Sequence, residues 1–363
     1  MLGVYVHVPF CESRCNYCAF SSFVRNDEID RYINALTKEI SSFNGDKIAS
    51  SIYFGGGTPS ILEKSQFERI FQALKSTFTL TDDCEITIEC NPNTFTADKG
   101  RFYRQMGVNR ISFGVQSLDD NILKFLSRRH SAAQALSAIK CAQECGFENI
   151  SADMLIGVNK NTDDFLKQVE LLCSQGVKHI SAYMLQIEEG TPLEKMVMAQ
   201  RDLLPDEDES IDQYNGVAKL LKKRGFERYE VSNFAVSGFE CRHNVNYWTG
   251  GDYVGFGLSA HSYIGGRRFA NANTFEKYYR GVLALDEQLS TRQLQEEHIM
   301  LGLRCKYGVD KKYLFGLGYD ISKNENLPEL LDKKIIFDCG GRLKLNEEYY
   351  GVNNLVIIKL LPD

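Results

Sequence analysis

The stretch Leu2-Gly-Val-Tyr-Val-His-Val8-Pro-Phe-Cys11-Glu-Ser-Arg-Cys15-Asn-Tyr-Cys18 joins an extended apolar run directly to three cysteines within eight residues. The apolar, β-branched run predicts a buried strand, so the cysteines lie on the loop that follows it. Thiolates are the usual ligands of iron–sulfur clusters, and such clusters normally take four. Three thiolates on one loop therefore predict a cluster in which one iron stays open to a ligand from outside the loop.

Zinc is the main alternative for these thiols, because His7 could add a fourth ligand to the three cysteines in a tetrahedral site. A disulfide with one spare thiol is a second alternative. No signal peptide precedes the loop, so we expect a reducing compartment, in which clustered cysteines usually bind metal. The loop therefore favours an iron–sulfur cluster over zinc, and metal binding over a disulfide.

The composition of the whole chain is that of a globular protein, with 43% of the 363 residues hydrophobic and 25% charged. A formal net charge of −6 argues against broad binding of nucleic acid, which requires a basic surface. No apolar stretch approaches the ~20 residues that span a bilayer. We therefore expect a cytoplasmic protein. Because the chain is too long for a single ordinary domain, we also expect one large domain and a smaller appendage.

The first 185 residues or so alternate short β-type runs with longer amphipathic helical patterns. The predicted strands cover residues 2–8, 51–54, 85–89, 110–115, 149–155 and 179–184. The predicted helices lie between them, at 28–43, 64–77, 97–106, 132–145 and 163–175. Strict β/α alternation predicts a parallel sheet covered by helices. Six units are too few for the eight of a closed barrel, so we expect an α/β partial (β/α)6 barrel, with a doubly wound sheet as the alternative.

The pattern changes in the second half of the chain. An acidic-to-basic amphipathic helix is predicted at 206–223, and a glycine- and aromatic-rich region follows it. Helices and then a short hairpin near 335–345 predict a small α+β module that resembles a winged helix. Acidic side chains are mixed into this module, so packing or docking of a partner is favoured over DNA binding. We expect three parts: a core at 1–235, an extension at 236–290 and a small C-terminal domain at 291–363.

Polar and glycine-rich motifs follow the ends of the predicted strands, where barrels of this kind hold their active sites. The second strand runs into Gly55-Gly-Gly-Thr58, the third ends at Glu89, and Gln116 follows the fourth. Three glycines without Cβ would let backbone amides approach a ligand closely, yet neither a phosphate loop nor a dinucleotide fingerprint is present. Glu89 could accept two hydroxyl hydrogen bonds from a ribose. Gln116, Arg128 and Asp153 could add an amide, a cation and a carboxylate.

Four motifs together resemble a known family: Tyr5-Val-His-Val-Pro-Phe-Cys11, the glycine turn, Gly114-Val-Gln-Ser117 and His243-Asn-Val-Asn-Tyr-Trp248. The C-x3-C-x2-C spacing is similar to that of the radical S-adenosylmethionine (SAM) superfamily. The set as a whole resembles the oxygen-independent coproporphyrinogen III dehydrogenase family, and within it the heme-chaperone (HemW-type) branch. The resemblance runs from Val4 to the C-terminus, with the motifs in order and correctly spaced.

The resemblance implies a cofactor site. Cys11, Cys15 and Cys18 would hold a 4Fe–4S cluster, whose open iron binds the amino and carboxylate groups of SAM. The residues expected around this SAM are Tyr5, Gly56, Gly57, Thr58 and Glu89. The positions that match further SAM contacts in the dehydrogenase, including contacts to a second SAM molecule, are Tyr17, Gln116, Arg128 and Asp153.

The resemblance also implies that the chain binds heme, and heme needs an axial ligand. His243 shares a motif with Tyr247 and with Trp248, the only tryptophan, and these aromatic rings could sandwich a porphyrin. Cys241 is a second candidate ligand. The alternative is that His243 is a buried, hydrogen-bonded side chain packed among aromatic rings.

Two departures separate the chain from the dehydrogenase of this family. That enzyme carries a further cysteine two residues after the triad, where this chain has Phe20, and an N-terminal extension that helps to form its substrate site. The leading hypothesis is a heme chaperone that binds heme, a 4Fe–4S cluster and SAM and delivers heme to acceptor proteins. Oxidative decarboxylation of coproporphyrinogen III is the runner-up, so the sequence leaves open whether the chain is an enzyme. A zinc-stabilised interaction protein is a third hypothesis.

The implied partners are heme and heme-accepting proteins. Peripheral contact with membrane-bound acceptors stays open, and no nucleic-acid partner is expected. The sequence does not indicate which protein accepts heme, whether SAM is cleaved, or what the oligomeric state is.

Overall fold

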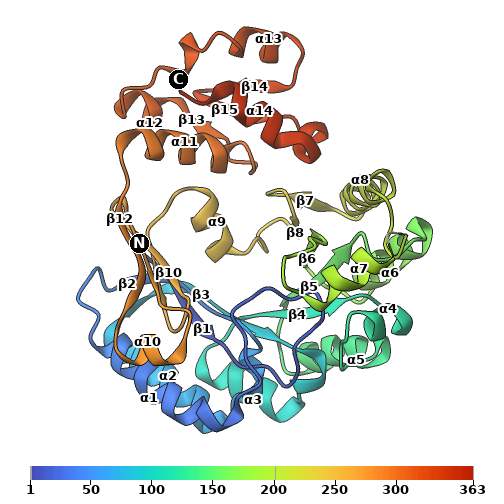
Figure 1. Cartoon of the computed structure of the whole chain (residues 1–363), viewed down its shortest axis with the longest axis vertical. Helices are drawn as coiled ribbons and strands as arrows, with labels where there is room; N and C mark the ends of the chain where they lie inside the picture. The colour runs from blue at the N-terminus through green and yellow to red at the C-terminus, as the bar shows by residue number, and fades with distance from the viewer. Residues whose placement is uncertain (1, 201, 363) are drawn as a thin grey trace.

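The computed structural model describes residues 2–200 and 202–362, and its centre is one twelve-stranded sheet (Figure 1). Six parallel strands follow each other in chain order: β1 (Leu2–Val8), β2 (Ile48–Gly56), β3 (Thr79–Cys90), β4 (Arg110–Gln116), β5 (Asn149–Ile156) and β6 (His179–Met184). The helices between them are α1 (Ile29–Ser41), α2 (Lys64–Thr77), α3 (Ala97–Met106), α4 (Asp120–Phe125), α5 (Ala132–Glu144) and α6 (Thr162–Ser174). The partial (β/α)6 barrel is therefore confirmed. A doubly wound sheet would reverse its strand order partway, and β1 to β6 do not.

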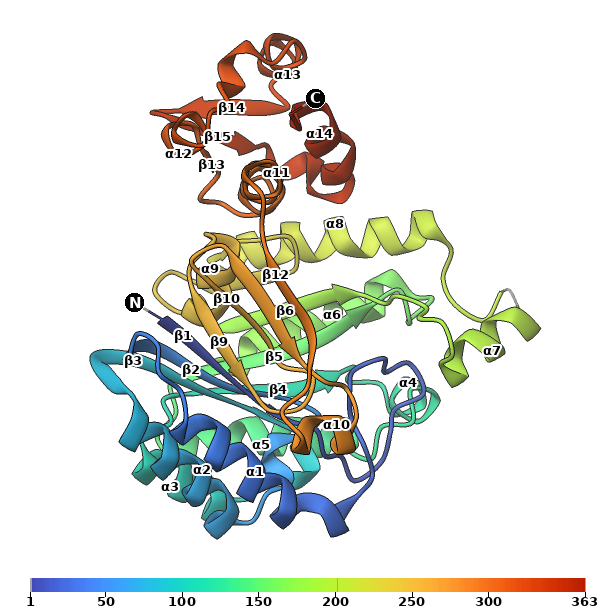
Figure 2. The same ribbon diagram turned by 60° about the vertical axis from the view of Figure 1, so that its left-hand side comes forward.

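The local sequence explains these elements. Strand β1 is buried along nearly its whole length, as a parallel strand covered on both faces must be, and Val4 and Val6 are fully buried. Helix α5 begins with a capping box between Ser131 and Gln134, which satisfies backbone N–H groups at its first turn. Helices α1, α2, α3 and α5 lie along one side of the sheet, and α6 lies beside α8 (Glu207–Lys223) of the second half (Figure 2).

Strands from the second half extend the sheet at both edges. On one side β9 (Tyr253–Phe256) pairs parallel with β1, and an antiparallel run adds β10 (His261–Ile264), β11 (Arg267–Asn271) and β12 (Leu283–Gln288). On the other side the sheet continues through β8 (Asn233–Val236) to β7 (Phe226–Arg228). The sequence analysis assigned no strands to residues 236–290, because these strands are only four to six residues long and are interrupted by glycine-containing turns. The helices of this half are α7 (Pro192–Ala199), α8 (Glu207–Lys223), α9 (Arg242–Trp248) and α10 (Phe275–Tyr279).

The C-terminal residues build a small module with its own core. Its elements are α11 (Thr291–Gly302), β13 (Val309–Asp310), α12 (Lys311–Gly316), α13 (Leu327–Asp332), β14 (Ile336–Cys339), β15 (Arg342–Leu345) and α14 (Asn353–Leu360). The three strands form an antiparallel sheet in the order β13-β15-β14, as expected for a small α+β, winged-helix-like domain. A separate cluster of buried apolar side chains, from Ile299 to Leu360, holds the module together.

Both figures place this module over the open face of the barrel, beyond α8 and α9 (Figures 1 and 2). Short 3-10 turns occur at Asn26–Glu28, Pro59–Ile61, Pro92–Thr94, Ile321–Lys323 and Glu347–Val352. Within residues 2–200 and 202–362, no helix is both long enough and apolar enough to cross a membrane.

Candidate functional site

The loop that carries the three cysteines is closed on itself and anchored at its centre. The backbone N–H of Phe23 donates to the carbonyl of Pro9 at 2.7 Å, and that of Cys11 donates to the carbonyl of Phe23 at 3.0 Å. Midway along the loop, the Asn16 side chain donates to the carbonyl of Phe125, and the Asn16 carbonyl accepts from the N–H of Leu193 at 3.0 Å. The three thiols are thus held on a tied loop, and all three are half-buried.

The surroundings of the thiols suit metal binding. Burial raises the pKa of Cys11 and of Cys18, so both thiols are protonated near neutral pH until a metal displaces the proton. The Arg128 guanidinium donates to the Cys15 sulfur at 3.4 Å, and the Thr58 hydroxyl lies 3.4 Å from the Cys11 sulfur. Hydrogen-bond donors of this kind stabilise thiolate once it forms.

In the structure, His7 is not available as the fourth ligand that the zinc alternative requires. His7 donates from Nε2 to the carbonyl of Ser21 at 2.9 Å, since a carbonyl can only accept. Nδ1 therefore accepts from the Tyr5 hydroxyl, at 3.0 Å, and neither ring nitrogen of His7 is free. Among the described residues, no three His, Cys, Asp or Glu side chains gather closely enough for one metal ion. Because a cubane binds each thiolate at a different iron, three thiols spaced around a loop fit the cluster better than zinc.

Eleven of the thirteen predicted site residues line one cavity of about 810 Å³, which we call the lumen cavity. They are Cys11, Cys15, Tyr17, Cys18, Gly56, Gly57, Thr58, Glu89, Gln116, Arg128 and Asp153. Because the strands are parallel, their carboxyl ends meet at this mouth of the barrel, next to the cysteine loop. Tyr350, Gly351 and Asn353 of the C-terminal module also line the cavity and help to enclose it.

The structure changes the interpretation of the glycine turn. A Cβ on Gly57 would lie 2.6 Å from the carbonyl oxygen of Phe10, and a Cβ on Gly56 would lie 2.5 Å from the His7 ring. Gly56 also has a positive φ of 112°. Both glycines are therefore required by the cysteine loop and by β1, so packing alone explains them. A valine at Gly56 would disturb His7 before it met any ligand.

Two carboxylates face the lumen. Glu89 accepts from the Tyr53 hydroxyl at 2.8 Å and from the backbone N–H of Gly56 at 3.2 Å. Burial raises the pKa of Glu89 to about 7, and nearby Asp153 acts in the same direction. Burial also raises the pKa of Asp153, which accepts from the Ser112 hydroxyl at 3.2 Å. Groups that titrate near the working pH while lining a cavity are typical of functional sites.

The end of β4 carries unusual backbone geometry. Gln116 has a positive φ of 67°, and the register between β4 and β5 shifts between Gly114 and Gln116. Such a conformation is costly for a residue with a Cβ and tends to occur at binding sites. Arg128 donates to the carbonyl of Gly114 at 2.6 Å and also reaches Cys15, so it connects this strand end to the cysteine loop.

Among the lumen residues that the sequence analysis did not name, Arg110 is the most unusual. Its side chain is 1% exposed, yet it lines the lumen cavity, and its Nε and Nη1 have no hydrogen-bond partner among the described residues. Buried donors without partners are costly and often mark the position of a ligand or of water. The available signal was an arginine at the first position of a strand whose next five residues are small or apolar.

Tyr5 and His243 lie outside the lumen cavity. Tyr5 instead lines a second cavity, and its hydroxyl is bonded to His7. His243 is 1% exposed, with Nδ1 at 2.8 Å from the Ser51 hydroxyl and Nε2 at 2.7 Å from the Tyr247 hydroxyl. Burial lowers the pKa of His243 to about 3, so the ring is neutral.

The two heme ligands suggested by the sequence are thus placed unfavourably. His243 could bind iron only by giving up a hydrogen bond inside the core, which matches the alternative of a buried, bonded histidine. Cys241 is fully buried as well, and its thiol donates to Glu85 at 3.5 Å. Burial raises the pKa of Cys241 to about 12, which disfavours the thiolate that iron requires. The geometry argues against both residues as ligands.

Comparison with known proteins gives the context for this site. Residues 5–173 match the family model of the radical SAM superfamily. The chain is 33% identical to heme chaperone HemW of Lactococcus lactis, over 99% of this chain and 97% of that protein. It is 32% identical to heme chaperone HemW of Bacillus subtilis, over 96% of each chain.

A solved structure supports the fold. Coproporphyrinogen III oxidase (HemN) from Escherichia coli, described as a radical SAM enzyme, superposes with a TM-score of 0.85 and covers 99% of this chain and 90% of its own. At 21% identity, this likeness concerns the fold. The end-to-end similarity to the two chaperones is closer in sequence, so the chain belongs to the heme chaperone HemW family of the radical SAM superfamily.

Proposed function

We propose that this protein is a heme chaperone that carries a 4Fe–4S cluster and SAM and delivers heme to acceptor proteins. One observation carries the proposal: the similarity to proteins named heme chaperone HemW extends over nearly the full length of both partners. The shared part therefore includes the C-terminal module and the region around α9, and not only the cofactor-binding barrel.

The lumen cavity is the proposed cofactor site. Cys11, Cys15 and Cys18 would hold the cluster, which supplies an open iron for the amino and carboxylate groups of SAM. Glu89 offers a carboxylate for ribose hydroxyls, while Arg128 orders the cysteine loop. Tyr17, Gln116 and Asp153 complete the polar lining toward the lumen. The same cavity is large enough for a ligand of SAM's class.

Oxidation of coproporphyrinogen III is less well supported. The likeness to the E. coli enzyme lies in the fold, at 21% identity. Phe20 stands where the resemblance implies a further cysteine in the dehydrogenase, and it is 71% exposed and lines the lumen cavity. Catalysis depends on close placement of the reacting carbon, and small misplacements reduce rates by orders of magnitude. A site that lacks a residue of the dehydrogenase is therefore expected to be a poor catalyst of its reaction.

The remaining parts of the proposal concern organisation and surroundings. We propose a core at 1–235, an extension at 236–290 and a C-terminal domain at 291–363. The proposed setting is the cytoplasm, where the chaperone would meet heme-accepting proteins, including membrane-bound ones that it contacts peripherally. The separate apolar core of the C-terminal residues supports a boundary near residue 290.

The test is anaerobic reconstitution of the purified protein with iron and sulfide, followed by two parallel assays. We expect it to bind hemin and transfer it to an apo-globin supplied as acceptor, without converting coproporphyrinogen III. Robust porphyrinogen turnover would establish the dehydrogenase instead. Failure to bind or transfer hemin would contradict the chaperone.

A further inference from the structure

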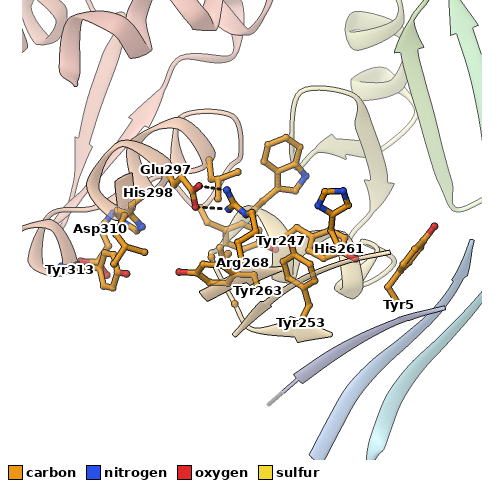
Figure 3. Close-up of a pocket in the computed structure, with 18 of the residues that line it drawn as sticks. Tyr5, Tyr247, Tyr253, His261, Tyr263, Arg268, Glu297, His298, Asp310 and Tyr313 are labelled. Atoms are coloured by element: carbon orange, nitrogen blue, oxygen red, sulfur yellow. Dashed lines mark hydrogen bonds and ion pairs between the residues drawn. The ribbon is translucent and has the colours of Figure 1, made fainter. Parts of the chain in front are cut away.

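A second cavity, of about 850 Å³, lies between the edge of the barrel and the C-terminal module (Figure 3). We call it the interdomain cavity. One wall comes from β9, β10 and β11 with the end of α9, and the other comes from α11, α12 and β15. The volume is in the range of sites that enclose a ligand of drug or cofactor size.

The barrel-side wall is a row of aromatic rings. The ring centroids of Tyr247 and Tyr253 are 4.5 Å apart, and those of Tyr253 and Tyr263 are 6.2 Å apart. Trp248 extends the row at the end of α9. Across the cavity, Tyr313 packs against His298 with centroids 4.6 Å apart (Figure 3). Two aromatic walls suit a flat, conjugated ligand, which they can contact through its faces.

One histidine in this cavity has free ring nitrogens. Five of the six histidines use at least one ring nitrogen in a hydrogen bond: His7, His130, His179, His243 and His298. His261, on β10, is exposed, lines the interdomain cavity, and has no ring hydrogen bond among the described residues. His261 and Tyr263 are two residues apart on the same strand, so both side chains project to the same face.

The ring of His261 is in the state that binds iron. The His261 side chain is exposed overall, but the partial burial of its ring lowers its pKa, and the neighbouring Arg268 acts in the same direction, so the imidazole is neutral near pH 7. Neutral imidazole has a lone pair available for a metal. Two residues earlier, Ser259 has a positive φ of 60°, and its buried hydroxyl has no partner in the described structure. Backbone strain of this kind collects at binding sites.

The cavity is also lined by basic side chains, which could bind acidic substituents of a ligand. Arg268 is paired with Glu297 at 2.7 Å, and Arg342 is paired with Asp310 at 3.0 Å. Lys344 lines the same cavity and has no ion pair among the described residues. An unpaired ammonium group in this cavity can donate charge-assisted hydrogen bonds to a carboxylate of a ligand.

We propose that heme binds in the interdomain cavity, with His261 as axial ligand, the Tyr247–Tyr253–Tyr263 row against the macrocycle and Lys344 toward a propionate. This rests on the proposed chaperone function and assigns its cargo a place separate from the lumen cavity. It also gives the α9 motif a role. His243 bonds the Tyr247 hydroxyl from behind, so it positions a ring of the wall and does not bind iron.

The test is hemin titration of the full-length protein, followed by its Soret spectrum. We expect His261→Ala to lose the wild-type Soret band and to weaken hemin binding by at least about tenfold, equivalent to ~1.4 kcal/mol. His298→Ala is the matched control, because His298 lines the same cavity but already accepts from the Asp310 N–H at 2.8 Å. That variant should keep the wild-type Soret position.

Since His261 is exposed, its variants should fold, and an unchanged thermal melt would verify this. In His261→Gly, added imidazole should restore the axial bond and the Soret band. A His261→Ala protein with wild-type affinity and spectrum would overturn the assignment while leaving heme binding intact. A wild-type protein that binds no hemin would instead contradict the chaperone function and, with it, this site.

Discussion

The two cavities are built in different ways. The lumen cavity lies at the ends of parallel strands that follow one another along the chain, and most of the predicted site residues line it. The interdomain cavity is lined by β1, by the region from α9 to β11 and by the C-terminal module, three parts of the chain that only the tertiary fold brings together. A cofactor site can therefore be read from sequence motifs, whereas a cargo site made by domain packing cannot.

The largest expected effect is loss of the cluster, which should affect the lumen cavity and leave hemin binding in the interdomain cavity. Protein purified without oxygen should contain about four irons per chain. Replacing Cys11, Cys15 or Cys18 by serine should abolish the cluster, measured by iron and sulfide content. Hemin should still bind these variants with the wild-type Soret band, because His261 is outside the loop. Stoichiometric zinc without sulfide would contradict the cluster.

The glycine turn provides a second test, at the level of stability. Gly56→Val should destabilise the fold by about 2–4 kcal/mol, through backbone strain and overpacking against His7. Gly146→Val is the control, because Gly146 also has a positive φ but nothing lies within 4 Å of its Cβ position. It should cost only the strain, about 1–2 kcal/mol. Denaturant unfolding measures both losses of unfolding free energy. If the two losses were equal, the contact between the new side chain and His7 would contribute nothing.

Variants of His243 test whether this residue stabilises the core or binds the heme iron. His243→Ala should lower stability by about 2–3 kcal/mol, because it leaves a cavity and deprives Ser51 and Tyr247 of their partner. Tyr247→Phe removes one hydrogen bond and should cost about 1 kcal/mol. Thermal unfolding measures both. If His243→Ala abolished the Soret band at temperatures where the protein stays folded, His243 would be the ligand after all.

Glu89 provides the smallest expected effect, confined to the lumen cavity. Its carboxylate accepts ribose hydroxyls better when ionised, and its pKa is about 7. SAM affinity of the reconstituted protein should therefore rise roughly three- to tenfold between about pH 6 and pH 8. Glu89→Gln should weaken SAM binding and flatten this dependence, as measured by the change in the paramagnetic resonance signal of the reduced cluster. If the SAM affinity of Glu89→Gln still rose with pH, the pH dependence would come from another titrating group.

The regular half of the fold could be predicted, because its signals are local. The six parallel strands and the five main helices between them follow from alternating patterns, and their centres agree with the structure. The strand β9 could not be predicted, because four residues next to glycines carry little periodicity and its pairing with β1 spans most of the chain. The two short helices α4 and α7 were missed for a similar reason, since each has too few turns to show an apolar face.

The site residues divide in the same way. The cysteines and Glu89 are read from motifs at strand ends. Gln116 was named, but its positive φ is a property of the β4–β5 register and not of its own neighbours. His261 has no motif at all; it stands out only once every other histidine is seen to be bonded. The sequence favoured His243 because Tyr247 and Trp248 share its motif, but the Tyr247 ring packs against His243 within the core.

Phe20 lines both cavities, so one side chain is shared by the two sites. A ligand that moves Phe20 from one side changes the free energy of binding on the other, and the factor is the same in both directions. A cluster that moves Phe20 would therefore change the affinity for hemin, and hemin that moves Phe20 would change the affinity for the cluster by the same factor. Values obtained from protein handled in air and from protein kept under nitrogen then describe two different thermodynamic states of the chaperone.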